Sequence, residues 1–219
     1  DRDRAHFVEL LAELAERFRV RLFAYVLMDN HYHLLFELRE PNLSQAMRWL
    51  NISYSVWFNR RHGRAGYLFQ GRYKSILVDP ASWGYRLSAY IHLNPVRTRR
   101  HGLGKTERQQ DRAGVGSAPT AEKVRTRLAA LRAFRWSSYR AYAGSASAPQ
   151  WLAPEAVLDQ GGGPKKGQRP AYRAFVEAKV KQGRMETPWE ELQDRVFLAG
   201  ADFVAQLKKE ARRATGKEE

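Results

Sequence analysis

Three absences in this sequence exclude whole classes of protein. The 219 residues contain no cysteine, which excludes a disulfide framework, a thiolate metal site and a thiol nucleophile. No uninterrupted apolar run approaches the ~20 residues that a bilayer-spanning helix needs, and the charged start "DRDRAH" differs from a signal peptide. We therefore expect a protein of the reducing cytoplasm that has no membrane partner.

Acidic residues are also scarce relative to basic ones. The chain has 38 Lys plus Arg against 23 Asp plus Glu, a formal charge of +15, which favours a polyanionic partner. Residues 60–100 hold nine basic residues and one acid, a net charge of +8, whereas residues 1–40 carry a net charge of −2. This uneven distribution predicts a nucleic-acid-binding face and a nucleoid-associated protein; solvated charges without a partner are the alternative.

Apolar periodicity predicts mixed α and β structure in the first half of the chain. Residues 3–18 place apolar side chains at spacings of three and four, as in an amphipathic helix. The runs "RLFAYVLM" and "HYHLLFEL" are joined by Asp29-Asn30, a pair that tolerates a tight turn, and predict a β-hairpin. Further helices are expected over residues 43–62 and 81–93, and another strand over residues 67–79, "YLFQGRYKSILVD".

The composition changes after Arg100. The stretch "HGLGKTERQQDRAGVGSAPT" has few apolar residues, as in a linker or mobile loop. Short helices are expected in "AFRWSSYRAYAG", "PAYRAFVEAKVKQG" and "PWEELQDRVFLAGADFVAQLKKEARR", the first capped by Ser137 or Ser138. We therefore divide the chain into a core domain (1–104), a flexible linker (105–126) and a helical C-terminal region (127–219). These helices either form a small domain or pack back on the core.

Two histidines interrupt the second strand of the hairpin. Side chains alternate along a strand, so His31 and His33 point to one face with their Cα atoms ~7 Å apart, while Tyr32 and Leu34 face the core. Two imidazoles at that spacing can bind one metal ion. A polar rim histidine paired by chance is the alternative.

A tyrosine on the expected helix 81–93 and an amide directly after it strengthen the metal hypothesis. Tyr90 and Asn94 are four residues apart, and so share one helical face at a separation of ~6 Å. The Asn94 amide oxygen can complete a site with two histidines, and mixed N and O ligands suit Mg²⁺ or Mn²⁺, although imidazoles alone would not exclude Zn²⁺. A core tyrosine is the alternative for Tyr90, and Tyr85 is a competing nucleophile without an amide four residues later.

Nucleic-acid contacts are expected from the basic window. One face of the strand over residues 67–79 and the turn after the helix over residues 43–62 supply most of these side chains; a solvent-facing edge strand protected by charge is the alternative. The candidates are Arg60, Arg61, Arg64, Gln70, Arg72, Lys74, Arg97, Arg99 and Arg100.

Four segments in order, "YVLMDNHYHLLFEL", "FNRRHGRAGYLFQGRYKSILVD", "YIHLNPVR" and "WSSYRAY", carry a family resemblance. The chain resembles the His-hydrophobe-His (HUH) single-strand DNA transposases with one catalytic tyrosine, most closely their REP-associated tyrosine transposase branch. The resemblance implies a divalent metal at His31 and His33, with Asn94 as the matching amide. It also implies attack by Tyr90 on DNA, giving a 5′-phosphotyrosine link and a free 3′-hydroxyl.

The resemblance also implies a ferredoxin-like antiparallel sheet with helices on one face, in an α+β fold. The family's opening strand has no counterpart here, so we expect a fragment or a gap that another segment or chain fills. The expected activity is metal-dependent cleavage and transfer of single-stranded or hairpin DNA, by a monomer or a homodimer. A DNA-binding protein with a degenerate site and a metal-dependent hydrolase of small phosphates are the alternatives.

Overall fold

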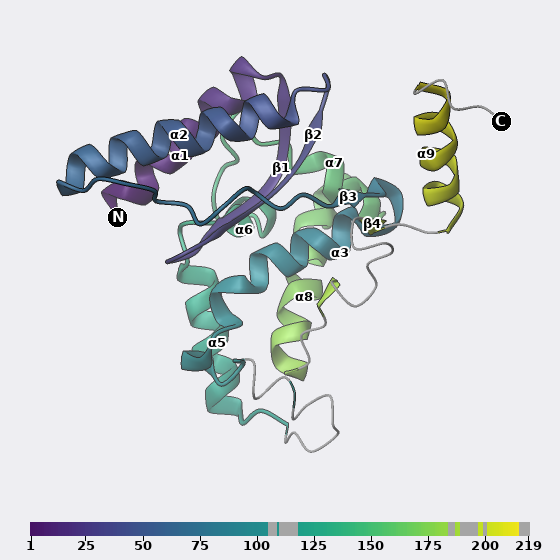
Figure 1. Ribbon diagram of the computed structural model, residues 1–219. Helices are drawn as coiled ribbons and strands as arrows, with labels where there is room; N and C mark the ends of the chain where they lie inside the picture. The colour runs from purple at the N-terminus through teal and green to yellow at the C-terminus, as the bar shows by residue number, and fades with distance from the viewer. Residues whose placement is uncertain (105–108, 110–117, 184–186, 189–196, 199–200, 215–219) are drawn as a thin grey trace.

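The computed structural model describes residues 1–104, 109, 118–183, 187–188, 197–198 and 201–214 (Figure 1). The first half contains α1 (Arg2–Arg17), β1 (Val20–Leu27), β2 (Tyr32–Leu38), α2 (Leu43–His62), β3 (Leu77–Val78) and α3 (Pro80–Leu93). The second half contains α5 (Ala121–Ala133), α6 (Tyr139–Tyr142), α7 (Glu155–Leu158), α8 (Lys165–Gln182), β4 (Phe197–Leu198) and α9 (Ala201–Ala214). This arrangement confirms the expected α+β class with an antiparallel sheet and a helical C-terminal region.

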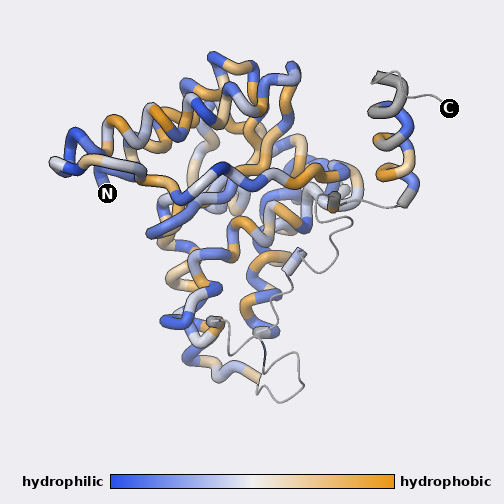
Figure 2. Tube along the Cα trace, in the orientation of Figure 1, coloured by the Kyte–Doolittle hydropathy of each residue, from blue (hydrophilic) through white to orange (hydrophobic). Residues whose placement is uncertain are grey.

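The predicted hairpin is the centre of the fold. β1 and β2 pair antiparallel, and the amide of Met28 donates to the carbonyl of His31 across the Asp29-Asn30 turn. A bulge between Leu22 and Ala24 shifts the register of β1. Both faces of the hairpin are covered, which explains why the strands are apolar along nearly their whole length (Figure 2).

Helices α1 and α2 cover one face of the hairpin. Leu11, Leu14 and Leu50 are fully buried there and pack in one cluster with Leu22 and Leu27 of β1. The last turn of α2 is basic, as the helix dipole favours, and the helix ends at Gly63 in the left-handed conformation. Both helices match their sequence-predicted bounds within a residue.

Helix α3 covers the opposite face. Its first turn is stabilised by Asp79, whose side chain accepts from the amide of Ala81, and by Pro80 at the first helical position. Ala24 and Val26 of β1 pack against the apolar side of α3. A 3₁₀ turn, Asn94–Val96, follows directly, so the helix ends before Pro95 as its sequence predicts.

The C-terminal region packs back on the hairpin. The amide of Leu27 donates to the carbonyl of Trp136. In the other direction, the amide of Ser138 donates to the carbonyl of Tyr25, and the amide of Ala153 donates to the carbonyl of Leu22. These bonds occupy the free edge of β1. Helix α5 begins at Ala121, inside the segment expected as a linker, while residues 105–108 and 110–117 of that segment lie outside the described part.

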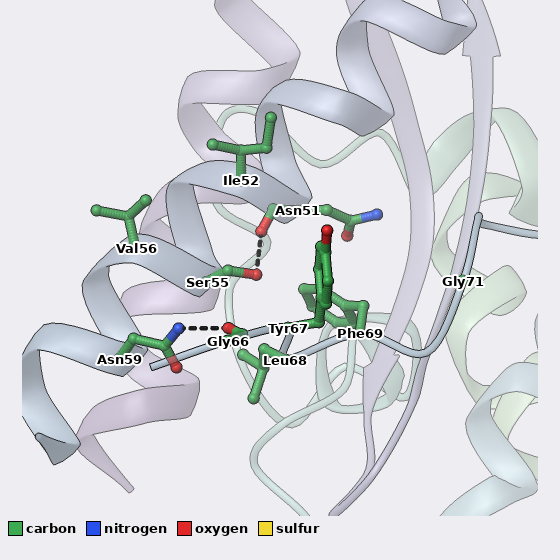
Figure 3. A pocket seen from close by; sticks show the side chains of 10 residues that line it. All are labelled: Asn51, Ile52, Ser55, Val56, Asn59, Gly66, Tyr67, Leu68, Phe69 and Gly71. Carbon is green, nitrogen blue, oxygen red and sulfur yellow. Dashed lines mark hydrogen bonds between the residues drawn. The ribbon is translucent and has the colours of Figure 1, made fainter. Parts of the chain in front are cut away.

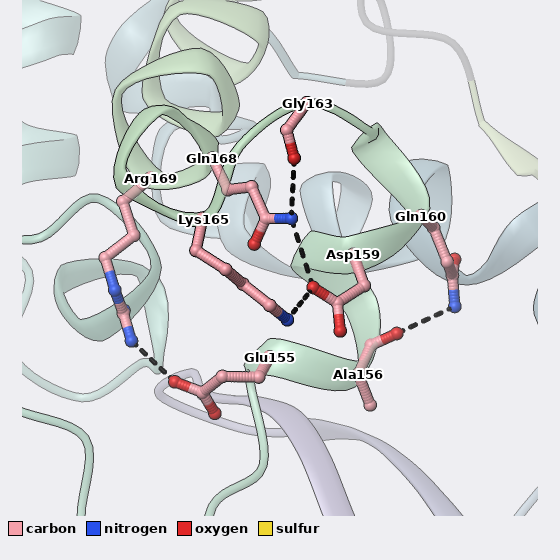
Figure 4. Close-up of polar contacts among 8 residues, drawn as sticks. All are labelled: Glu155, Ala156, Asp159, Gln160, Gly163, Lys165, Gln168 and Arg169. Carbon is pink, nitrogen blue, oxygen red and sulfur yellow. Dashed lines mark hydrogen bonds and ion pairs between the residues drawn. The ribbon is translucent and has the colours of Figure 1, made fainter.

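Helices α7 and α8 are tied together by charged side chains (Figure 4). Asp159 accepts from Lys165 and, at 3.1 Å, from Gln168, while Arg169 pairs with Glu155 at 2.7 Å. These contacts join the short helix α7 to the first turns of α8.

One strand prediction and one helix prediction need correction. Residues 67–76 form no strand, and only Leu77–Val78 pairs, in parallel with β4. Positive φ angles of 92° at Gly66 and 78° at Gly71 interrupt extended pairing, and Phe69 and Tyr73 instead pack against the α1–α2 core. In the last predicted helix, Phe197–Leu198 is a strand and 201–214 is helical, while 189–196 and 199–200 lie outside the described residues. Across the described ranges, no helix is both long and apolar enough to cross a membrane.

Candidate functional site

The two histidines lie at the start of β2 with their rings close together. His31 immediately precedes the strand and His33 lies within it. Their ring centroids are 5.1 Å apart and the rings are nearly perpendicular. The Nδ1 atom of His31 lies 2.7 Å from Oδ1 of Asn30, which can accept its proton and so leave Nε2 as the ligating atom. The two imidazole rings therefore lie next to each other at the start of β2.

Burial keeps both histidines neutral. It lowers the pKa of His33 to about 4, with further lowering by His31 and Arg97, which are nearby groups of like charge. Burial also lowers the pKa of His31, against the opposing effect of Asp29. Neutral imidazole is the form that binds a metal ion, so protons do not compete strongly at neutral pH.

Tyr90 lies against this pair. Its ring centroid is 5.9 Å from that of His33, and the two rings meet edge to face. The contact joins α3 to β2, two elements that are distant in the sequence. Tyr85, the competing nucleophile, instead packs on Tyr172 and Phe175 of α8, at centroid distances of 5.0 Å. The structure therefore brings Tyr90 to the histidines, whereas Tyr85 lies within the α3–α8 contact.

Asn94 is held in a defined orientation at the end of α3. Its side-chain nitrogen donates to the carbonyl of Tyr90 at 2.9 Å and to that of Ile91 at 3.3 Å. The amide oxygen is therefore the end that can bind a cation.

The three arginines after α3 occupy different environments. The Arg97 guanidinium lies 4.6 Å from the ring centroid of Tyr90, and Arg97 is only 7% exposed. A guanidinium stacked on the Tyr90 ring restricts the orientation of that ring. Arg99 and Arg100 are exposed and remain available to a nucleic-acid backbone.

The donor set is compatible with a divalent metal ion. Two neutral imidazoles and one amide oxygen are mixed N and O donors, which Mg²⁺ and Mn²⁺ accept when water and phosphate oxygens supply the remaining positions. No cluster of three or more His, Cys, Asp or Glu side chains placed to hold a metal occurs within the described ranges. The site would therefore depend on Asn94 and on the substrate for its other ligands.

The remaining expected DNA contacts lie on the surface. Arg60, Arg61 and Arg64 are exposed at the end of α2 and in the turn that follows. Arg61 pairs with Asp3 at 3.0 Å. Gln70, Arg72 and Lys74 are exposed as well, but they belong to an irregular segment, so strand alternation does not place them on one face.

Sequence reasoning missed a buried polar chain behind Tyr90. His92 is fully buried; its Nδ1 lies 2.7 Å from the Tyr172 hydroxyl and its Nε2 lies 2.7 Å from Ser138 Oγ. Ser138 Oγ also accepts from the backbone amide of Tyr25 and makes no cap bond to α6, whereas Ser137 Oγ, the other expected cap, accepts from the amide of Tyr139 at 3.3 Å. The available signal was a histidine among the apolar positions of an amphipathic helix.

One proton arrangement satisfies this chain of hydrogen bonds. Ser88 donates to the carbonyl of Tyr85, so it accepts from Tyr172, whose oxygen then accepts from Nδ1 of His92. Nε2 accepts from Ser138 at 2.7 Å, the shorter of the two contacts available to that hydroxyl hydrogen, since the Tyr25 carbonyl lies 3.3 Å away. Burial lowers the pKa of His92 to about 3, so the imidazole is neutral as this arrangement requires. The chain connects α3 to β1, α6 and α8.

The first part of the chain is similar to a transposase family. Residues 1–94 match the family model described as IS200-like transposase, and the matched range includes His31, His33, Tyr90 and Asn94. No curated protein and no solved structure matches the chain. The match therefore indicates similarity to transposases over residues 1–94.

Proposed function

We propose that this protein is a metal-dependent endonuclease and strand transferase that acts on single-stranded or hairpin DNA through a phosphotyrosine at Tyr90. The observation that carries the proposal is the placement of the Tyr90 ring 5.9 Å from His33, which itself lies 5.1 Å from His31. A nucleophile and two neutral metal ligands thus converge from separate elements. The family match over residues 1–94 supports the DNA-processing part of the proposal.

Tyr90 forms the covalent link in the proposed reaction. Its hydroxyl oxygen bonds to the phosphorus of a backbone phosphate and the bond from phosphorus to the 3′ oxygen breaks, with the phenolic proton lost and a proton gained by the 3′ oxygen. The products are a 5′-phosphotyrosine and a free 3′-hydroxyl. Attack by a 3′-hydroxyl on this linkage rejoins or transfers the strand without an external energy source.

The surrounding side chains orient the reacting groups. Mg²⁺ or Mn²⁺ at His31, His33 and Asn94 would polarise the scissile phosphate and stabilise the charge that develops on it. Arg97 restricts the Tyr90 ring from one side. On the other face of β2, the Tyr32 hydroxyl donates to Oδ1 of Asn51 at 2.7 Å, which anchors the strand so that the histidines face outward.

The basic window supplies the proposed DNA-binding surface. Arg60, Arg61, Arg64, Gln70, Arg72, Lys74, Arg99 and Arg100 are exposed, and the window has a net charge of +8. We assign the protein to the REP-associated branch on the order of its four sequence motifs, with the nucleoid as its place of action. A DNA-binding protein with an inactive Tyr90 is the competing function.

An adduct assay tests the proposal. The full chain is incubated with Mn²⁺ and a labelled DNA hairpin that carries a single-stranded flank, and a denaturation-resistant protein–DNA adduct is measured. Wild type should form the adduct, Tyr90→Phe should not, and Tyr85→Phe, the matched control on the same helix, should behave as wild type. His31→Ala should abolish the adduct but leave DNA binding nearly unchanged, because the cationic surface lies elsewhere.

The outcomes separate the candidate functions. An adduct formed by Tyr90→Phe would contradict the role of Tyr90. Binding without cleavage across several sequences and metals would favour the inactive DNA-binding protein. Cleavage that requires His31 but leaves no adduct would indicate a hydrolase.

A further inference from the structure

Exposed apolar side chains gather at one place on the outer face of α2. Four large hydrophobic residues are exposed among those that the structure describes, and three of them, Ile52 (50%), Val56 (45%) and Tyr67 (99%), line the same hollow (Figure 3). The hollow measures about 330 Å³ and lies between α2 and residues 66–71. The hollow is open to solvent, and the Tyr67 side chain at its rim is almost fully exposed.

Two amides at this hollow have fixed orientations. Oδ1 of Asn51 accepts from the Tyr32 hydroxyl at 2.7 Å, so its nitrogen is the end that can donate to a ligand. The nitrogen of Asn59 donates to the carbonyl of Gly66 at 2.8 Å, so its oxygen is the end that can accept (Figure 3). The hollow therefore combines an apolar surface and an exposed aromatic ring with one donor and one acceptor.

The charge around the hollow is positive. Ile52 and Val56 also line an adjoining hollow, in which Arg60, Arg61 and Trp57 lie. No residue that lines either hollow carries a carboxylate, although Asp3 pairs with Arg61 from outside. This surface complements a polyanion that also presents an apolar, planar group.

We propose that the hollow binds one unpaired nucleobase of single-stranded DNA, with Tyr67 stacked on the base and Arg60 near the adjacent phosphate. A base has two apolar faces and a polar edge with donors and acceptors, which matches the residues present. The site is separate from the Tyr90 site, because Tyr32 reaches Asn51 from the face of β2 opposite to His31 and His33. The inference rests on the proposed action on DNA and adds a second contact to it.

The test uses the full chain carrying Tyr90→Phe, which should bind DNA without cleaving it. The probe is a DNA hairpin with a single-stranded flank, in which 2-aminopurine replaces one unpaired base at a time. At one position the fluorescence should be quenched on binding, and Tyr67→Phe should retain the quenching. Tyr67→Ala should lose the quenching and bind about 5- to 150-fold more weakly, the range expected for one lost base stack.

Three controls make the assignment specific. Leu77→Ala changes the fourth exposed hydrophobic residue, which lies outside both hollows, and should have no effect. The salt dependence of binding should be the same for Tyr67→Ala as for its parent, because no phosphate contact is lost. Removing the quenched base to leave an abasic site should weaken binding by the parent but have little further effect on Tyr67→Ala.

The nucleobase site would be overturned if Tyr67→Ala left both the affinity and the fluorescence change unaltered. It would also be overturned if the losses of affinity caused by the abasic site and by Tyr67→Ala simply added in free energy. If substitution of Arg60 weakened binding but removal of no single base did, the surface would contact phosphates alone. Because the Tyr90 adduct is measured separately with the unmodified chain, its formation can stand while this inference fails. If the unmodified chain binds no DNA at low salt, both proposals are wrong.

Discussion

Burial affects the charge of single residues in opposite ways in this protein. His33 and His92 are neutral because burial lowers their pKa values, to about 4 and about 3. Glu177 of α8 is also buried, with 8% of its side chain exposed, yet it is paired with Arg132 at 2.6 Å and Arg173 at 3.0 Å. Burial acts to raise the pKa of Glu177, but the two arginines outweigh it and the pKa is lowered.

This lowered pKa predicts an acid-sensitive contribution to stability. A carboxyl whose pKa is lower in the folded than in the unfolded protein stabilises the fold above its unfolded pKa, and the contribution is lost as the pH falls through the folded value. Glu177→Gln should therefore lower the free energy of unfolding by about 1 to 2 kcal/mol at pH 7, a range reduced because both arginines are about half exposed.

Urea unfolding of Glu177→Gln and wild type between pH 7 and pH 3 measures this effect. The difference between the two proteins should shrink below about pH 4.5, as wild-type Glu177 takes up a proton. Glu155→Gln is the matched control, because Glu155 also pairs with an arginine but its side chain is 57% exposed. A difference that stays constant with pH would show that the charge of Glu177 contributes nothing.

At the scale of one element, α3 carries two pairs of residues on opposite sides. Tyr90 and Asn94 are four residues apart and belong to the candidate site, whereas Ser88 and His92, also four apart, are buried in hydrogen bonds with Tyr172. Since an α-helix turns by about 100° per residue, the two pairs face away from each other. The buried pair thereby sets which side of α3 is presented to the histidines.

Ser138 is the link in this arrangement that a substitution can remove most cleanly. Ser138→Ala deletes the hydroxyl between the Tyr25 amide and His92 Nε2 and leaves both buried groups without that partner. The free energy of unfolding should fall by about 1 to 3 kcal/mol. The exchange of the Tyr25 amide hydrogen with solvent should also become faster.

The neighbouring Ser137→Ala is the control for Ser138→Ala. Ser137 is equally buried but accepts only one longer bond, at 3.3 Å from the Tyr139 amide, so its loss should cost less. Thermal or urea unfolding, with hydrogen exchange of Tyr25, checks both variants. Equal losses in the two variants would show that the bridge to His92 has no special role.

At the scale of the whole molecule, the positive charge is concentrated on one stretch of chain. The window 60–100 has a net charge of +8 while the first forty residues have −2, although both pack around one hairpin. Exposed cations at the end of α2 and in the irregular segment before β3 therefore form a continuous stretch of sequence with few acids. Such a distribution gives binding that depends on counterion release.

The salt dependence of DNA binding should report these contacts. Replacing Arg72 and Lys74 together by Gln should reduce the slope of log affinity against log salt by about 1.4, since each phosphate contact to a single strand contributes about 0.7. The double variant Lys123→Gln/Arg125→Gln on α5 removes the same charge from exposed positions elsewhere and should leave the slope nearly unchanged. Equal slopes for the two double variants would mean that net charge alone determines binding.

The sequence by itself determined the local elements and the spacing within them. Helix α1, the hairpin, α2 and α3 follow from apolar periodicity and turn residues, because these signals depend on neighbours within a few positions. The same local rule placed His31 with His33 and Tyr90 with Asn94. The prediction of a strand over residues 67–76 was wrong, because a β-branched, aromatic composition favours a strand only where a partner strand is available.

Tertiary structure decided what lies next to what. The 5.9 Å approach of Tyr90 to His33 and the bond between His92 and Ser138 join residues that are far apart in the chain. The gathering of Ile52, Val56 and Tyr67 at one hollow has the same origin. Periodicity carries no information on such pairs, because they depend on how the buried faces of separate elements pack around the hairpin.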